Sequence, residues 1–230
     1  MAKNRHFAAL VAGTLIACGL CVTSSAQSSY YEEDPRTFYA GPVFGGNFTQ
    51  VDGDNYAGYS KPGFNVGGVL YMHMAPKVAA SMEILFSQKG AVSNIVKNAG
   101  LTGLIIQKYR LNLNYAEVPV MLQFFDKRKS HAGFGLSVSR LITMNERADV
   151  EPKSVSVPDF ERDFPVNKMD YNFLVGANLH CWKGIFFNLR FQYSLTPMRK
   201  NIDPRFGRTE QFNNMFAVRV IYLFGYNSLR

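Results

Sequence analysis

Apolar and polar side chains alternate with a period of two along eight segments of the chain. The alternation is clearest in Met169–Cys181, where every second residue is apolar and the residues between them include Asp170 and Asn172. A period of two is typical of β-strands because successive side chains point to opposite faces of a sheet. The eight predicted strands are Phe38–Thr49, Gly63–His73, Val78–Gln88, Tyr109–Phe125, His131–Thr143, Met169–Cys181, Ile185–Leu195 and Phe212–Phe224.

One predicted strand, Tyr109–Phe125, changes phase along its length. In Leu111–Tyr115 the apolar residues stand at odd-numbered positions, whereas in Val118–Phe124 the even-numbered positions are all apolar. One extra residue in a strand produces such a slip, so the pattern predicts a β-bulge near Ala116. Pro119 cannot donate a backbone hydrogen bond and suits an irregular stretch better than a regular ladder.

The predicted connections alternate between long and short. The long ones lie around residues 50–62, 89–108, 144–168 and 196–211, and the short ones around residues 74–77, 126–130 and 182–184. This rhythm is typical of outer-membrane β-barrels, which have long external loops and short periplasmic turns. An even number of strands places both ends of the barrel domain on the periplasmic side.

The composition of the two strand faces favours a membrane barrel over a soluble sheet. The polar face carries mainly Gly, Ser, Asn and Gln, and only 18% of all residues are charged, whereas 14% are aromatic. A soluble sandwich or lipocalin-like barrel usually carries many Lys and Glu on the face that meets water. We therefore predict an all-β fold, an eight-stranded antiparallel up-and-down transmembrane β-barrel over residues 38–226, in the cell outer membrane.

The first 26 residues have the features of a secretory signal peptide. Lys3 and Arg5 supply positive charge, Phe7–Ala17 is apolar, and Ser24–Ala26 offers small residues for cleavage. We predict cleavage after Ala26, which defines a signal peptide at residues 1–26. A polar, acidic flexible leader follows at residues 27–37.

The cysteines leave two alternatives open. Leu15–Cys18 resembles a lipobox, so lipidation at Cys18 competes with cleavage after Ala26; the apolar run continues through Leu20–Val22, which favours cleavage. Cys181 would then be the only cysteine of the mature chain, and no intramolecular disulfide can form. Cys181 is either a reactive thiol or a small apolar residue on a strand, and its place in an apolar row favours the second interpretation.

Four charged residues fall near mid-strand on the predicted inner face. Glu83 and Glu117 lie on neighbouring strands, and Arg190 and Arg219 lie on neighbouring strands across the barrel. Isolated charges in a narrow interior are costly, whereas a hydrogen-bonded network offsets their desolvation. We predict a structural charge network that closes the lumen, because side chains normally fill an eight-stranded barrel. A gated ion path is the alternative.

The histidines that follow the predicted cleavage site are His73, His131 and His180. The pattern of connections places all three at the periplasmic ends of their strands. A lipid-directed outer-membrane enzyme would need a Ser/His or Asp/His set at the outer rim, where its substrate arrives. We therefore predict no catalytic residues, no cofactor and no metal site, and an interfacial structural role for the histidines.

Basic residues cluster in the fourth long connection. Arg199, Lys200, Arg205 and Arg208 are candidates for contact with lipopolysaccharide phosphates or with a partner protein, and a solvated face is the alternative. The sequence contains no Gly-rich phosphate loop and no nucleic-acid motif. The predicted partners are outer-membrane lipid, including lipopolysaccharide, and envelope or secretion proteins, but not nucleic acid.

Several stretches have a composition that is specific enough to compare with a known family. They are Gly41–Phe48, Val51–Asp54 with Gly58–Phe64, Glu83–Gly90 and Leu113–Val120. Together they resemble the PorT-like outer-membrane β-barrel family of the Bacteroidota, and the resemblance covers residues 38–225. It implies an eight-stranded outer-membrane barrel without recognised catalytic residues, in which Glu117 and Pro119 are structural. The namesake of that family takes part in type IX secretion.

The residues and the resemblance together predict a non-enzymatic outer-membrane barrel. We expect it to act as an envelope scaffold or as an accessory of type IX-like protein secretion. The alternatives are a small lipid-modifying enzyme of the outer membrane, a passive pore and an adhesin.

Overall fold

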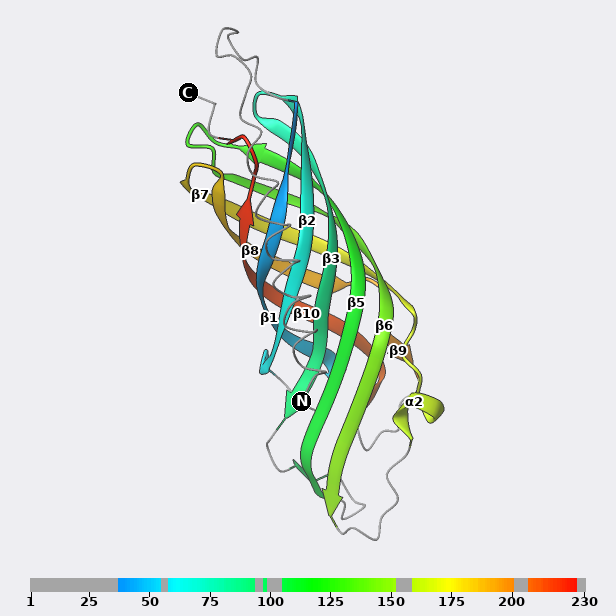
Figure 1. Cartoon of the computed structure of the whole chain (residues 1–230). Coiled ribbons are helices and arrows are strands. Elements are labelled where there is room, and N and C mark those ends of the chain that lie inside the picture. The colour runs from blue at the N-terminus through cyan, green and yellow to red at the C-terminus, as the bar shows by residue number, and fades with distance from the viewer. Residues whose placement is uncertain are drawn as a thin grey trace, which may run out of the picture. The chain divides into compact units, whose positions relative to one another are not determined.

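The strands of the described chain form one antiparallel sheet that closes into a barrel (Figure 1). Neighbours in sequence pair with each other, and β1 pairs with β10 to complete the ring, for example through Val43 and Ile221. The eight long strands are β1 (Phe38–Asp54), β2 (Lys61–Ala75), β3 (Val78–Ser93), β5 (Ile105–Phe125), β6 (His131–Glu151), β7 (Met169–Trp182), β8 (Ile185–Ser194) and β10 (Gly207–Tyr222). The predicted fold, an all-β up-and-down barrel, is confirmed.

The computed structural model describes residues 37–54, 58–93, 97–98, 105–151, 159–200 and 207–226. Two short strands, β4 (Lys97–Asn98) and β9 (Arg199–Lys200), and a short helix, α2 (Phe160–Asp163), lie in the connections. The predicted signal peptide, the lipobox cysteine and all of the predicted leader except Thr37 lie outside the described residues. No helix among the described residues is long and apolar enough to span a membrane.

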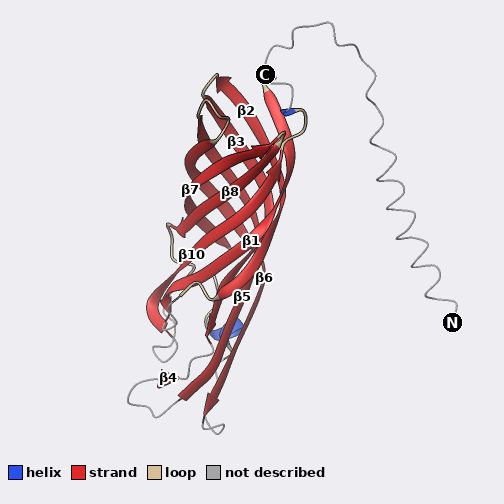
Figure 2. Cartoon of the chain, turned by 90° about the vertical axis from the view of Figure 1, so that its left-hand side faces the viewer, coloured by secondary structure: helices blue, strands red, loops and turns tan. Residues whose placement is uncertain are grey.

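The two ends of the barrel differ in their connections. Short turns at residues 76–77, 126–130 and 183–184 lie at one end, the short-turn end, together with Thr37 and Tyr226. The connections after β1, β3, β6 and β8 lie at the other end, the long-loop end (Figure 2). The predicted alternation of long and short connections is therefore present in the structure.

Several strands run further toward the long-loop end than the alternation predicted. β5 and β6 contain 21 residues each, about twice the ~9–11 residues that cross a tilted bilayer. Figure 2 shows both strands continuing beyond the rest of the sheet. The outer half of β5 still pairs with β3 as far as Tyr109 and with β4 at Ile105 and Ile106, whereas β6 pairs with β7 only as far as Arg140.

The outer surface of the barrel is a belt of apolar side chains. Ile84 is 66% exposed and Leu136 is 58% exposed, although large apolar side chains of soluble proteins are normally buried. The residues that alternate with this apolar row along each strand point inward, and many of them are polar, for example Ser87 on β3 and Ser137 on β6. Alternation with the apolar row outward is what a barrel in lipid requires.

The predicted bulge near Ala116 is wrong in its position. Side chains of β5 alternate without interruption, so that Leu113 and Tyr115 point inward in phase with Glu117. The irregularity lies in the partner strand, because Asn114 pairs with Thr143 and Tyr115 pairs with Leu141, which leaves Ile142 as the extra residue of β6.

An apolar cluster inside the long-loop end explains the misleading pattern. Its buried members, which we call the long-loop cluster, are Val51, Ala91, Ile106, Tyr109, Leu111, Leu113, Tyr115, Val166 and Met198. In the outer half of β5 the apolar residues point inward into this cluster, whereas in the inner half the interior is polar and the apolar residues point outward to lipid. The apolar positions therefore change from odd to even numbers although the backbone of β5 keeps its alternation.

Candidate functional site

Glu83 is the centre of the polar interior. It stands on β3, is 2% exposed, and binds two guanidiniums from the opposite wall. Arg190 of β8 donates from Nη1 to Glu83 Oε2 at 2.9 Å and from Nη2 to Oε1 at 2.6 Å. Arg219 of β10 donates from Nη1 to Oε2 at 2.8 Å and from Nε to Asn188 Oδ1 at 2.7 Å. Bidentate guanidinium–carboxylate pairs of this kind are strong and orient both partners.

Glu117 does not share this pair of arginines. Its Oε2 lies 3.4 Å from Nζ of Lys89, which also lies 3.4 Å from Oδ2 of Asp170. Asp170 in turn accepts hydrogen bonds from Ser194 Oγ at 2.7 Å and from Asn213 Nδ2 at 3.0 Å. The interior thus has a second ionic layer, and both Glu117 oxygens lack a hydrogen-bond donor within the described chain.

The sequence pattern missed Lys89 and did not count Asp170 among the interior charges. The predicted strand ends at Gln88 and leaves Lys89 in a long connection, whereas β3 continues to Ser93 and keeps its alternation. The phase of Lys89 relative to Glu83, six residues earlier, is the signal that places it inside. The alternation puts Asp170 on the inward face, and only ring closure shows that it faces Lys89.

A third ionic layer lies toward the long-loop end. Arg199 donates from Nη1 to Glu146 Oε1 at 3.2 Å, and Tyr109 also donates to this carboxylate. Arg199 is only 1% exposed, so its charge does not reach the surface. The predicted contact between Arg199 and lipopolysaccharide phosphates needs an exposed guanidinium and is therefore wrong for this residue. The reason is that β9 turns the side chain inward over the long-loop cluster.

The other basic residues of that predicted group have different positions. Lys200 is exposed, and its Nζ lies 3.6 Å from Glu210 Oε1. Arg205 lies outside the described residues. Arg208 belongs to β10, but its side chain is not described. The structure therefore leaves the lipopolysaccharide contact of these three residues as a prediction.

The three layers leave little free space at the middle of the barrel. The void between Glu117, Arg190 and Arg219 measures about 10 Å³, roughly the room of one water molecule. The charges of the layers balance, with four carboxylates facing four cations: Glu83, Glu117, Glu146 and Asp170, and Lys89, Arg190, Arg199 and Arg219.

Aromatic rings and the three histidines fill the short-turn end. His131 stacks on Phe125 with ring centroids 4.2 Å apart, and its Nε2 lies 3.1 Å from the Tyr71 hydroxyl. His73 also packs on Phe125, and His180 packs on Phe186. The histidines lie at this end, as predicted. Among the described residues, no cluster of His, Cys, Asp and Glu has the arrangement of a metal site.

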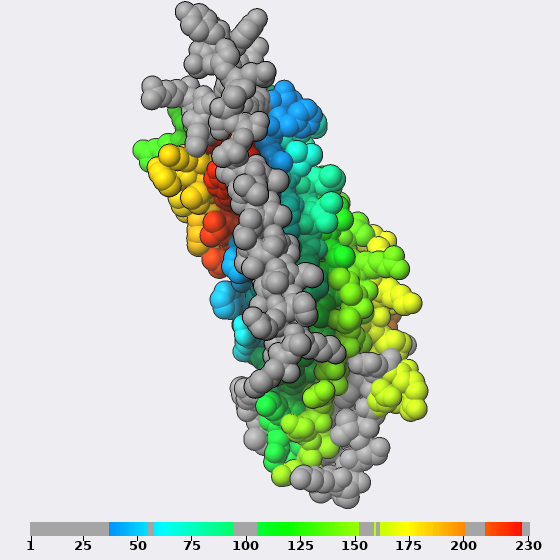
Figure 3. Space-filling model, in the orientation of Figure 1, coloured from blue at the N-terminus to red at the C-terminus, as the bar shows by residue number. Residues whose placement is uncertain are grey.

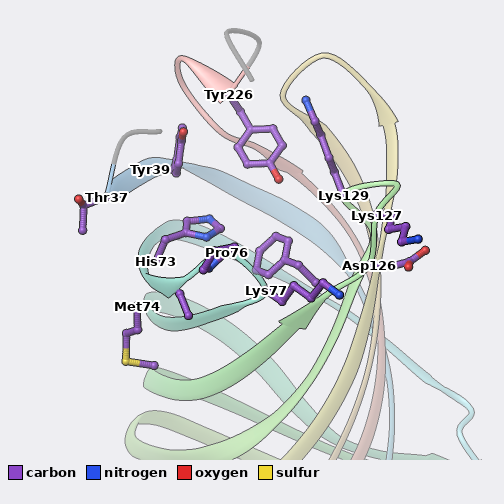
Figure 4. Close-up of a pocket in the computed structure, with 12 residues that line it drawn as sticks. Thr37, Tyr39, His73, Met74, Pro76, Lys77, Asp126, Lys127, Lys129 and Tyr226 are labelled. Atoms are coloured by element: carbon purple, nitrogen blue, oxygen red, sulfur yellow. The ribbon is translucent and has the colours of Figure 1, made fainter. Parts of the chain in front are cut away.

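A cavity of about 510 Å³ opens beside this aromatic packing, at the short-turn end (Figure 4). Tyr39, His73 and Tyr226 form its apolar side, where Tyr39 packs edge to face on both other rings, and Figure 4 shows the three rings close together. Lys77 and Lys127, from the two turns, stand on the other side. Tyr226 follows the end of β10, and burial raises its pKa to about 12, so its phenol stays protonated at neutral pH.

Comparison with known families decides where such a barrel belongs. Residues 25–200 match the family described as outer membrane protein beta-barrel domain. The chain belongs to this family. The match covers most of the chain, and β10, which lies beyond it, completes the ring. Membership in this family and the apolar belt place the protein in the outer membrane.

Solved structures of other outer-membrane proteins are similar to the chain at low sequence identity. Ail, the attachment invasion locus protein of Yersinia pestis, is 10% identical with a TM-score of 0.43, and the match covers 82% of this chain and 100% of Ail. Neisserial surface protein A is 9% identical with a TM-score of 0.43 and coverages of 83% and 99%. OprG from Pseudomonas aeruginosa is 10% identical with a TM-score of 0.37 and coverages of 81% and 94%. No curated protein sequence matches the chain.

Proposed function

We propose that this protein is a non-enzymatic, closed outer-membrane barrel that serves as an envelope scaffold or as an accessory of protein secretion. The filled interior carries the proposal. Three ionic layers, the long-loop cluster and the aromatic packing at the short-turn end follow one another along the barrel. With its interior occupied by its own side chains, the barrel has only its surface and its two ends to offer to other molecules.

The same packing argues against a passive pore. A conducting path would have to separate Glu83 from both arginines, and each contact is a short hydrogen bond inside a protein interior. Breaking a buried ion pair by removing one partner costs about 3–5 kcal/mol. Planar-bilayer recording of the purified protein tests this point, and we expect no unitary conductance. Regular current steps would overturn the closed-barrel proposal.

The position of the histidines argues against a lipid-directed enzyme. His73, His131 and His180 are the only histidines after residue 26. All three pack against aromatic rings at the short-turn end, away from the long connections. The purified barrel, incubated with phospholipid and lipopolysaccharide vesicles, should leave both lipids chemically unchanged by mass spectrometry. Release or transfer of an acyl chain would contradict the proposal.

The secretion role rests on the resemblance to PorT-like proteins and on the short-turn end. In the proposed orientation this end faces the periplasm, and its cavity lies beside Lys77 and Lys127, neither of which has a carboxylate partner within 4.0 Å among the described residues. An accessory of secretion needs a periplasmic contact surface of this kind, and lysines in turns favour an acidic partner.

Photo-crosslinking tests this contact. A crosslinking residue at Met74, which lines the cavity, should capture a periplasmic or envelope protein in cells. The matched position is Lys200 at the long-loop end, which is also exposed and should not capture the same protein. A deletion strain should also accumulate unsecreted cargo. Normal secretion, together with no protein captured at Met74, would overturn the accessory role.

A further inference from the structure

The outer surface of β5 and β6 changes from apolar to basic at one level of the barrel. Val118 and Val138 pair across the two strands and belong to the apolar belt. One outward position further toward the long-loop end, Ala116 pairs with Arg140, which is exposed. Two residues along a strand span ~7 Å, so Arg140 stands at the edge of the lipid-facing belt.

Arg140 lies beside the start of β7. It pairs with Met169, and the next residue, Leu141, donates a backbone hydrogen bond to the carbonyl of Lys168 at 2.8 Å. The Arg140 side chain is exposed and has no carboxylate within 4.0 Å in the part of the chain that the structure describes. One cation therefore lies at the border of the belt.

A pair of cations lies further out on the same face. Arg110 of β5 and Arg147 of β6 are direct partners in the antiparallel ladder, and both side chains are exposed. Like charges directly opposite each other destabilise a sheet. Within the described residues no carboxylate lies within 4.0 Å of either guanidinium. Six residues separate this level from that of Ala116, a distance of ~20 Å along the strand.

The levels of Arg140 and of Arg110 with Arg147 differ from the outward positions around them. On the β1–β10 side, outward positions at the long-loop end carry Asp52 and Glu210, and at the tip of β5 and β6 exposed Lys108 pairs with exposed Asp149. Figure 3 shows the green side chains of β5 and β6 on the outer surface toward the long-loop end. An anion that contacts β5 and β6 between the belt and this mixed tip would therefore meet three cations in two levels.

We propose that the outer face of β5–β6, with Arg110, Arg140 and Arg147, binds the phosphate groups of lipopolysaccharide. Lipopolysaccharide carries phosphates beside its acyl chains and on the sugars just outside them, which suits two levels of cations above an apolar belt. Guanidiniums bind phosphate oxygens in bidentate fashion, and a phosphate between Arg110 and Arg147 would replace their repulsion by attraction. The site rests on the outer-membrane location and is independent of the secretion role.

Binding of purified lipopolysaccharide to the detergent-solubilised full barrel tests the site. Wild-type protein should bind intact lipopolysaccharide at least about tenfold more tightly than the double variant Arg110→Gln/Arg147→Gln, because two charged contacts are lost. Arg140→Gln should weaken binding as well. The matched control is Lys77→Gln/Lys127→Gln, which removes the same charge from exposed positions at the short-turn end and should leave the affinity unchanged.

Enzymatically dephosphorylated lipopolysaccharide separates phosphate recognition from contact with acyl chains. Removal of the phosphates should weaken binding to wild-type protein as much as the double substitution does, and the two losses should not add. Equal affinity for the intact and dephosphorylated forms, or equal weakening by the control variant, would overturn the proposal. Capture of an acidic protein that depends on the same arginines, without any phosphate effect, would assign the face to a protein partner instead.

Discussion

Arg219 donates to Glu83 at 2.8 Å although 136 residues separate them in the sequence. The contact spans the interior from β10 to β3, and β1 and β2 lie between these strands in the sheet. It exists because the ring closes between β1 and β10. Closure of the sheet therefore also brings Arg219 to its carboxylate partner.

The two interior glutamates should differ in their importance for stability. Glu83→Gln leaves two buried guanidiniums without their carboxylate and should lower the free energy of unfolding by about 3–5 kcal/mol. Glu117→Gln removes one ion pair at 3.4 Å, while Lys89 keeps Asp170, and should cost only about 1 kcal/mol. Urea unfolding in lipid vesicles, with the gel shift of unheated samples, measures both. Equal losses would contradict this ranking of the layers.

Arg190→Ala should weaken the barrel less than Glu83→Gln. Arg219 still binds Glu83 in this variant, so the carboxylate keeps one partner. Removing both arginines leaves the carboxylate buried without a cation, and the loss should exceed the sum of the two single substitutions because the residues share a partner. A double-mutant cycle on unfolding midpoints provides the measurement. Additive single effects would show that the two arginines act independently.

Gly45 should be required for the position of Arg219. The two residues are cross-strand partners, and a Cβ at Gly45 would lie 2.4 Å from the Val218 carbonyl oxygen and 2.6 Å from Cγ of Arg219. Gly45→Ala should therefore push β10 and the Arg219 side chain away from β1, weaken the contact with Glu83 and cost about 1–3 kcal/mol. Gly46→Ala is the control, because the nearest atom to its Cβ is a carbonyl oxygen at 3.9 Å. Similar stabilities of the two variants would disprove the close approach.

The inward phase of β5 predicts opposite outcomes for two truncations. Leu113 is fully buried in the long-loop cluster, so Leu113→Ala should create a cavity and cost about 2–5 kcal/mol. Val120 is 53% exposed on the lipid side, and Val120→Ala should cost less than about 1 kcal/mol because lipid fills the space. Unfolding in vesicles compares the two. A small effect of Leu113→Ala would support the bulge that the sequence pattern predicted.

The orientation of the barrel predicts which cysteines an impermeant reagent reaches. Cys181 is exposed near the short-turn end, and a bulky, charged maleimide added to intact cells should not label it. Lys200→Cys in a Cys181→Ser background should be labelled, because residue 200 is exposed at the long-loop end. Gel mobility of the labelled protein gives the readout. Labelling of Cys181 in intact cells would reverse the proposed orientation.

The alternation of side chains made most of the fold predictable from the sequence. About ten residues of sequence are enough to recognise a strand, because its period of two depends only on neighbouring residues. All eight long strands contain most of the corresponding predicted segments, and residues such as Ile84 and Leu136 lie on the predicted outer face. The inward position of Glu83, Arg190 and Arg219 follows from the same alternation.

The sequence pattern predicted the wrong position for three residues, and each error has a physical reason. Leu113 looks like a lipid-facing residue because an apolar lumen and a lipid bilayer select the same side chains. Lys89 looks like a loop residue because a charged side chain late in a strand resembles the start of a connection. Arg199 looks like a surface residue because its carboxylate partner, Glu146, comes from another strand.

The sequence by itself determined the number of strands, their faces and the rhythm of their connections, because each depends on neighbouring residues. Only the tertiary structure decided that Glu83 holds both arginines, that Glu117 pairs with Lys89, and that Arg110 faces Arg147. These relationships depend on ring closure and on the register between strands. A shift of register by two residues would keep every side chain on its face and still change every partner.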